Sequence, residues 1–180
     1  MTSIRFTIDD AQRAHDEWGC NCGPAALAAM CDLTLDEVRR HMGDFEQKHY
    51  TNPTLMFRAL DSLGARYTRA YLGEKRAGAS LTVRGWPSRG LARIQWEGPW
   101  TRPGVPMAAR YRQTHWVGAL TTPSGNVGVW DVNCMKNGSG WVSVEKWNEI
   151  LVPWLLAECH PKADGKWHIT HAIELREPKS

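Results

Sequence analysis

The sequence lacks the long apolar segments that would place it in a membrane. No run approaches the roughly 18 apolar residues that a membrane-spanning helix needs, and the first six residues contain no apolar core of a signal peptide. A glycine-rich phosphate loop is also missing, because Gly78, Gly85 and Gly90 have no strand–loop–helix context. We therefore expect no membrane partner and no nucleotide-binding loop.

The chain also has little cysteine and little excess charge. The five cysteines form an odd set, which favours free thiols and a reducing, cytoplasmic location. The formal net charge is only +3, and the basic residues are scattered, so no nucleic-acid partner is expected. Arginine is denser in the middle segment, which is more typical of a solvated face but leaves an anionic partner open: Arg84, Arg89, Arg93, Arg102, Arg110 and Arg112.

The 180 residues contain no linker rich in proline, glycine or serine and no internal repeat. A protein of this size buries roughly 70% of its unfolded surface. We therefore predict one domain over residues 1–180.

Cys22 is the most informative residue that is present. It stands directly before Gly23 and Pro24, at the start of an alanine-rich run that ends at Met30. Proline is favoured in the first turn of a helix and alanine is the strongest helix former, so we predict a helix over 23–31 with the thiol at its N-terminus. The helix dipole and unpaired N–H groups there favour the nucleophilic thiolate. The alternative interpretation is that Cys22 is only a small hydrophobic residue buried in the core.

Helical patterns come first and strand patterns follow. A capping box at 34–37 opens a short second helix, and a third is predicted over 53–63, after the polar stretch 43–52. Strands are then predicted over 66–72, 91–96, 114–120, 127–133 and 166–175, with a loop over 97–113 and a helix that starts at Val144 after Ser143 and is kinked or ended by Pro153. This order predicts an α+β fold in which three N-terminal helices, led by the one with Cys22, pack on an antiparallel sheet.

His115 and Asp131 are placed symmetrically about the turn between two predicted strands. Each lies eight residues from a centre near Pro123. Directly opposed residues in a hairpin have Cβ atoms about 4.5–5.5 Å apart, so Asp131 can orient His115 and stabilise its imidazolium. Asn133, two residues further along the same face, is the alternative orienting residue. The other interpretation is that His115 and Asp131 form an ordinary pair on the protein surface. The order Cys, His, Asp along the chain is, however, that of a nucleophile, a base and an orienting group.

Three segments, 22–27, 115–117 and 129–131, resemble the papain-like cysteine peptidases. The resemblance is closest to the double-glycine-leader peptidases, the processing domains of bacteriocin exporters, and to their stand-alone relatives. It covers about 18–150, since 143–147 resembles the helix that follows the acid in that group. It implies a papain-like fold, a cleft between helices and sheet, and a Cys-His-Asp triad that cleaves amide bonds of a peptide or protein substrate without a cofactor.

The resemblance also implies a glutamine six residues before the nucleophile, whose amide helps to hold the oxyanion; this sequence has Asp16 there. A carboxylate does not donate a hydrogen bond, and its charge repels an oxyanion. Gln12 and Asn21 are nearby amides at other spacings, and the backbone N–H of Cys22 is a further donor. Asp16 thus leaves open an inactive papain-like domain that binds a peptide or protein partner.

Other chemistries are less well supported by the sequence. A peptidoglycan amidase or endopeptidase would use the same triad, but neither an export signal nor a wall-binding repeat is visible. His171 competes with His115 as the base, although no acid on a following strand would orient it. The aromatic residues Trp18, Trp116 and Trp130 are expected mainly to support the cleft by packing.

A zinc site is not expected. The ligands would have to come from Cys20, Cys22, Cys159, His160, His168 and His171. These residues include no Cys-x2-Cys pair, and the last two histidines would point to opposite faces of a strand. Cys20 is then a bystander thiol.

Overall fold

Six antiparallel strands form one sheet in the computed structural model, which describes residues 4–71, 85–110 and 112–176. In sheet order they are β1 (Tyr67–Tyr71), β6 (Trp167–Leu175), β2 (Arg89–Trp96), β3 (Thr114–Thr121), β4 (Val127–Trp130) and β5 (Trp141–Ser143). The predicted strands are found close to their expected positions, and β5 is an addition. Residue 72 of the first predicted strand lies outside the described residues.

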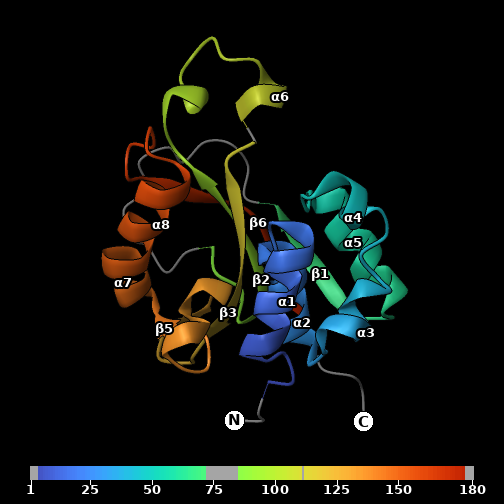
Figure 1. The fold of residues 1–180 in the computed structure, drawn as a ribbon. Coiled ribbons are helices and arrows are strands. Elements are labelled where there is room, and N and C mark those ends of the chain that lie inside the picture. Colours follow the sequence, from blue (N-terminus) through green and yellow to red (C-terminus); the bar gives the residue numbers. More distant parts are fainter. Residues whose placement is uncertain (1–3, 72–84, 111, 177–180) are drawn as a thin grey trace.

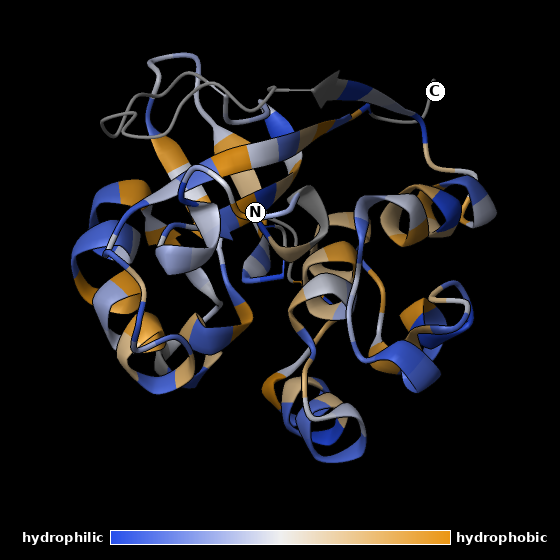
Figure 2. Ribbon diagram, turned by 90° about the horizontal axis from the view of Figure 1, so that it is seen from above, coloured by the Kyte–Doolittle hydropathy of each residue, from blue (hydrophilic) through white to orange (hydrophobic). Residues whose placement is uncertain are grey.

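Helices cover both faces of this sheet, as Figures 1 and 2 show. One face carries α1 (Ile8–Trp18), α2 (Cys22–Cys31), α3 (Leu35–Arg39), α4 (Phe45–Lys48) and α5 (Pro53–Ser62). The other packs against the C-terminal helical segment, which consists of α7 (Val144–Lys146), a π-helical turn (Trp147–Leu151) and α8 (Val152–Cys159). Alternating side chains of the central strands therefore enter two separate apolar cores.

The prediction of three N-terminal helices is wrong, because α1 precedes the helix that carries Cys22 and α4 lies within the stretch 43–52. The sequence does contain signals for α1. Thr7 and Asp10 form a reciprocal capping box, and Gly19 ends the helix in the left-handed conformation, with φ 67°. The buried side of α1 is largely alanine, so its apolar period is weak.

Helix α2 begins one residue before the predicted range and is buried from Gly23 to Met30. Two glycines allow this helix to lie close to its neighbours. A Cβ on Gly23 would lie 2.1 Å from Oγ1 of Thr51, and a Cβ on Gly118 of β3 would lie 2.8 Å from Cε of Met30. The closeness to Thr51 requires glycine at position 23, whereas the flexible side chain of Met30 fills the space above Gly118.

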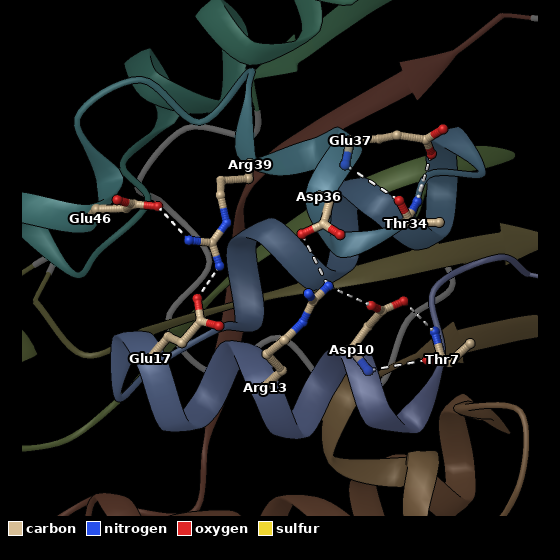
Figure 3. A network of polar contacts seen from close by, with 9 residues as sticks. All are labelled: Thr7, Asp10, Arg13, Glu17, Thr34, Asp36, Glu37, Arg39 and Glu46. Carbon is tan, nitrogen blue, oxygen red and sulfur yellow. Dashed lines mark hydrogen bonds and ion pairs between the residues drawn. The ribbon is translucent and has the colours of Figure 1, made fainter.

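An exposed network of charges ties α1 to its neighbours (Figure 3). Arg13 of α1 lies 3.1 Å from Asp36 of α3. Arg39, at the end of α3, contacts both Glu17 of α1 and Glu46 of α4. Single exposed pairs contribute only about 0–1 kcal/mol, so the main effect of the network is to orient α1, whose last turn leads directly into α2.

The predicted hairpin of β3 and β4 exists, but its pairing centres on Ser124, one residue later than predicted. His115 and Asp131 are therefore not directly opposed, and the predicted strand is too long. β4 ends one residue before Asp131, which instead caps a 3-10 helix, η2 (Val132–Asn137). A shift of the centre by one residue moves the opposed position by two, so Asp131 stays on the same face as His115.

The C-terminal helical segment does not end at Pro153. The π-helical turn before α8 makes the N–H of Val152 bond to the carbonyl of Trp147, and Pro153 then lies in the first turn of α8, where a missing N–H costs little. The predicted loop 97–113 also contains two short helices, η1 (Pro99–Thr101) and α6 (Met107–Arg110).

The α+β class is confirmed by this arrangement of helices and antiparallel sheet. Within the described ranges, no helix combines the length and apolar character needed to cross a membrane.

Candidate active site

Three elements meet at the candidate site. Cys22 is the first residue of α2, His115 is the second residue of β3, and Asp131 directly follows β4. The thiol of Cys22 interacts with the imidazole of His115, which lowers the pKa of the thiol. Because β4 ends before Asp131, the start of β3 is not covered by a paired strand on that side, and the helix-borne thiol reaches it there.

His115 is held between the thiol and the carboxylate. Its Nε2 lies 2.8 Å from Oδ2 of Asp131, and the two side chains are almost fully buried. A carboxylate accepts, so Nε2 carries a proton and Nδ1 is the nitrogen that faces the thiol. The ring of Trp96 stacks on the imidazole at 6.0 Å, with an interplanar angle of 21°. The histidine is thereby fixed in both position and tautomer.

Asp131 accepts four hydrogen bonds, two on each oxygen. Oδ2 receives His115 Nε2 and Trp147 Nε1, each at 2.8 Å. Oδ1 receives the backbone N–H of Asn133 at 2.9 Å and its side-chain amide at 2.8 Å. The buried carboxylate is therefore fully satisfied as an anion. Asn133, the alternative orienting residue, is placed as a donor to Asp131.

The three groups stabilise one another's charged forms. Burial opposes ionisation of Cys22, but His115 and a backbone hydrogen bond from Trp116 outweigh it, so the pKa of the thiol is lowered from its usual 9.0. Burial also opposes the charge of His115, yet Asp131 and Cys22 raise the pKa of the imidazole well above its usual value. The pKa of the Asp131 carboxyl is lowered despite burial, first by His115 and then by Trp147 and Asn133. Both shifts favour the thiolate–imidazolium pair over the neutral thiol and imidazole.

Three other cysteines have the opposite shift. Burial raises the pKa of Cys20 and of Cys31 to about 11 each, and that of Cys134 to about 12. The Cys20 thiol donates to the backbone carbonyl of His49. Among these four thiols, only Cys22 is activated by its surroundings.

The expected oxyanion residues are engaged elsewhere. Asp16 lies on the exposed side of α1 and accepts from the amide of Gln12 at 2.9 Å. Asn21 donates its side-chain amide to the carbonyl of Ala11 at 2.8 Å, which ties α2 to α1. Within the described structure, no hydrogen bond uses the backbone N–H of Cys22 at the start of α2. That N–H is the donor that the structure offers to an oxyanion.

The three predicted supporting tryptophans are buried. Trp18 packs against Phe45 at 5.1 Å. Trp116 donates to the carbonyl of Thr51 at 2.8 Å, and Trp130 donates to a backbone carbonyl as well. They support the helices and the hairpin, as expected.

The other two histidines considered from the sequence, His168 and His171, contact residues outside the triad. His168 contacts the carboxylate of Glu97 at 3.1 Å. The His171 ring lies 6.5 Å from that of Phe57, and its pKa is lowered to about 4 by burial and by the charge of Arg93. Over the described ranges, no group of three or more His, Cys, Asp or Glu side chains is arranged to hold a metal ion.

Two residues of the site were missed by sequence reasoning. Trp147 bonds to Asp131, and its ring stacks at 6.0 Å on Trp96, which in turn stacks on His115. A signal for Trp147 was available, since it lies in the predicted helix after Ser143. The contact of Trp96 depends on the β2–β3 register, in which Ile94 opposes His115, and this register has no local signal in the sequence.

Comparisons of the sequence with models of known protein families and with curated proteins give no match. The functional argument therefore rests on the geometry of the site.

Proposed function

We propose that this protein is a cysteine peptidase or isopeptidase-like hydrolase with a papain-like fold, which cleaves a peptide amide bond through Cys22, His115 and Asp131. The observation that carries the proposal is the series of interactions from the half-buried thiol of Cys22 to the buried imidazole and carboxylate, with the pKa of Cys22 lowered and that of His115 raised. Perturbed groups of this kind cluster at functional sites. Free thiols support a reducing, cytoplasmic setting.

The geometry suggests a two-step mechanism. The Cys22 thiolate attacks the carbonyl carbon, and the backbone N–H at the start of α2 stabilises the oxyanion. The C–N bond then breaks as the imidazolium of His115 gives its proton to the leaving amine, which leaves a thioester on Cys22. Water, deprotonated by His115, hydrolyses the thioester and releases the acid. Asp131 keeps Nε2 protonated and the ring oriented throughout.

The likeness to papain-like enzymes is supported by the order of the elements. The thiol opens a helix seated on the sheet, and the base and acid come from that sheet and its hairpin. Trp96 and Trp147 shield the pair of His115 and Asp131 from water, which strengthens their interaction.

A second candidate is a papain-like domain that binds a peptide or protein partner without cleaving it. Asp16 favours it, because a carboxylate stands where the resemblance implies an amide donor, and Gln12 and Asn21 are bonded to other groups. A peptidoglycan amidase or endopeptidase is an alternative substrate class for the same triad.

The test is hydrolysis of a mixed peptide library, supplemented with peptidoglycan stem peptides, with products identified by mass spectrometry. We expect cleavage by the wild type, none by Cys22→Ser, and unchanged cleavage by the matched Cys20→Ser variant. Cutting of the stem peptides alone would assign the substrate to the cell wall. No cleavage, together with a Cys22 that is alkylated no faster than free cysteine, would favour the binding domain.

A further inference from the structure

Between β2 and β3, residues 97–110 and 112–113 project beyond the end of the sheet next to the candidate site; we call them the arm. It leaves the sheet after Trp96, which stacks on His115, and rejoins it at Thr114, one residue before His115. Figure 1 shows the arm with α6 at the top of the molecule, at the opposite end from both termini. The arm therefore starts and ends beside the imidazole.

A loop from the C-terminal helical segment packs against the base of the arm. The backbone N–H of Asp164 donates to Glu97 at 2.8 Å, and the N–H of Glu97 donates to Lys166 at 2.9 Å. Trp100 of the arm donates to the carbonyl of Trp96 at 2.7 Å, and its ring lies 6.4 Å from that of His160. The arm and the loop 160–166 thus form one wall on the side of His115.

This wall carries an excess of basic side chains. Between Gly98 and Thr114 the sequence contains three arginines and no acidic residue. The basic residues of the wall are exposed, or half-buried in the case of Arg110: Arg102, Arg110, Arg112, Lys162 and Lys166. Opposite charge is limited to Asp164 and to Glu158 at the end of α8, since Glu97 is buried against His168.

The chemistry of the site fixes which part of a substrate meets this wall. His115 protonates the leaving amine, so the substrate residues that follow the cleaved bond lie on the side of His115. The carbonyl oxygen lies on the other side, toward the N-terminus of α2. We infer that the arm and the loop 160–166 bind the leaving-group side of the substrate and select peptides with acidic residues there, an inference that rests on the proposed hydrolase function.

The test uses the same mixed peptide library, read for the residues that follow each cut. We expect Asp and Glu to be enriched within the first few positions after the cleaved bond. Each exposed ion pair should contribute a factor of about two to five, and the enrichment should weaken as salt is raised toward about 1 M, where the screening length is about 3 Å.

Charge reversal supplies the matched comparison. Arg102→Glu/Arg112→Glu should shift the preference after the cut from acidic to basic residues, and Arg102→Ala/Arg112→Ala should reduce it without reversing it. Arg40→Glu is the control, because Arg40 is exposed and directly follows α3, which lies far from α6 in Figure 1. This charge reversal should leave the preference for acidic residues unchanged. Thermal melting checks that each variant is folded.

The outcomes separate the two claims. Cleavage without acidic enrichment, or an enrichment that survives the double reversal, overturns the inference and leaves the hydrolase intact. No cleavage of any peptide by a folded wild type overturns the proposed hydrolase and this inference with it. An enrichment that the double reversal inverts supports both.

Discussion

Cys20 and Cys22 are separated by one residue, yet their surroundings drive their thiols in opposite directions. Burial raises the pKa of Cys20 to about 11, and its thiol donates to a backbone carbonyl. Cys22 is half-buried against the core, but His115 and a backbone hydrogen bond from Trp116 lower its pKa. Since the two share their local sequence, the difference shows that distant residues decide which thiol is a nucleophile.

Removing the imidazole of His115 should have the largest effect on the difference between the pKa values of Cys20 and Cys22. In His115→Ala, burial and the charge of Asp131 oppose ionisation of Cys22 and the backbone hydrogen bond from Trp116 is the remaining favourable contact. The pKa of the thiol should therefore rise above the usual value, and hydrolysis should fall by about 10⁴-fold or more. The matched control is His171→Ala, which removes the competing base and should keep both activity and fast alkylation of Cys22. Retained hydrolysis in His115→Ala, or its loss in His171→Ala, would reassign the base.

The difference in reactivity between Cys20 and Cys22 can be measured by alkylation with a limiting amount of reagent. At neutral pH, a thiol with a pKa of about 11 is ionised in about one molecule in 10⁴, whereas the pKa of Cys22 is lowered toward the thiolate. Iodoacetamide should therefore modify Cys22 about 10³-fold faster than Cys20, as mapped by mass spectrometry of the folded protein. If Cys20, Cys31 or Cys134 were modified before Cys22, the assignment of Cys22 as the nucleophile would be contradicted.

Asp16 tests whether the activated thiol has a complete oxyanion site. Asp16 lies on the exposed side of α1 and accepts from Gln12, so Asp16→Gln should leave hydrolysis unchanged. A rise of about 10²–10³-fold would show instead that its carboxylate repels the oxyanion. Glu17→Gln is the control, as it makes the same change on α1 at a residue paired with Arg39. Equal activity of a stable Asp16→Gln variant and the wild type would mean that another donor serves the oxyanion.

The smallest expected loss of activity concerns the support of Asp131. Trp147→Phe leaves the buried carboxylate one donor short, which should cost about 1.5–3 kcal/mol of stability. Turnover should fall about tenfold, equivalent to about 1.4 kcal/mol in the transition state. Trp167→Phe is the matched control, since Trp167 packs on Trp147 at 5.2 Å but donates to Asn148. Similar turnover in the two variants would mean that Trp147 contributes by packing and not through its hydrogen bond to Asp131.

Local sequence determined a large part of this protein. The Gly-Pro-Ala run after Cys22 places it at a helix start, because proline and alanine favour that position whatever surrounds it. The alternating segments around His115 give the strands of the hairpin, and the order of elements gives the α+β class. Such signals act within a few residues, so they are readable without a structure.

Tertiary structure decided the rest. The contact of His115 with Asp131 survives a hairpin centre one residue later than predicted, because the side-chain parity of the strands is kept. The stacking of Trp96, the donor from Trp147 and the opposite pKa shifts of Cys20 and Cys22 arise between elements far apart in the sequence. Their physical cause is burial and electrostatic contact, which depend on packing between elements and leave no local pattern in the sequence.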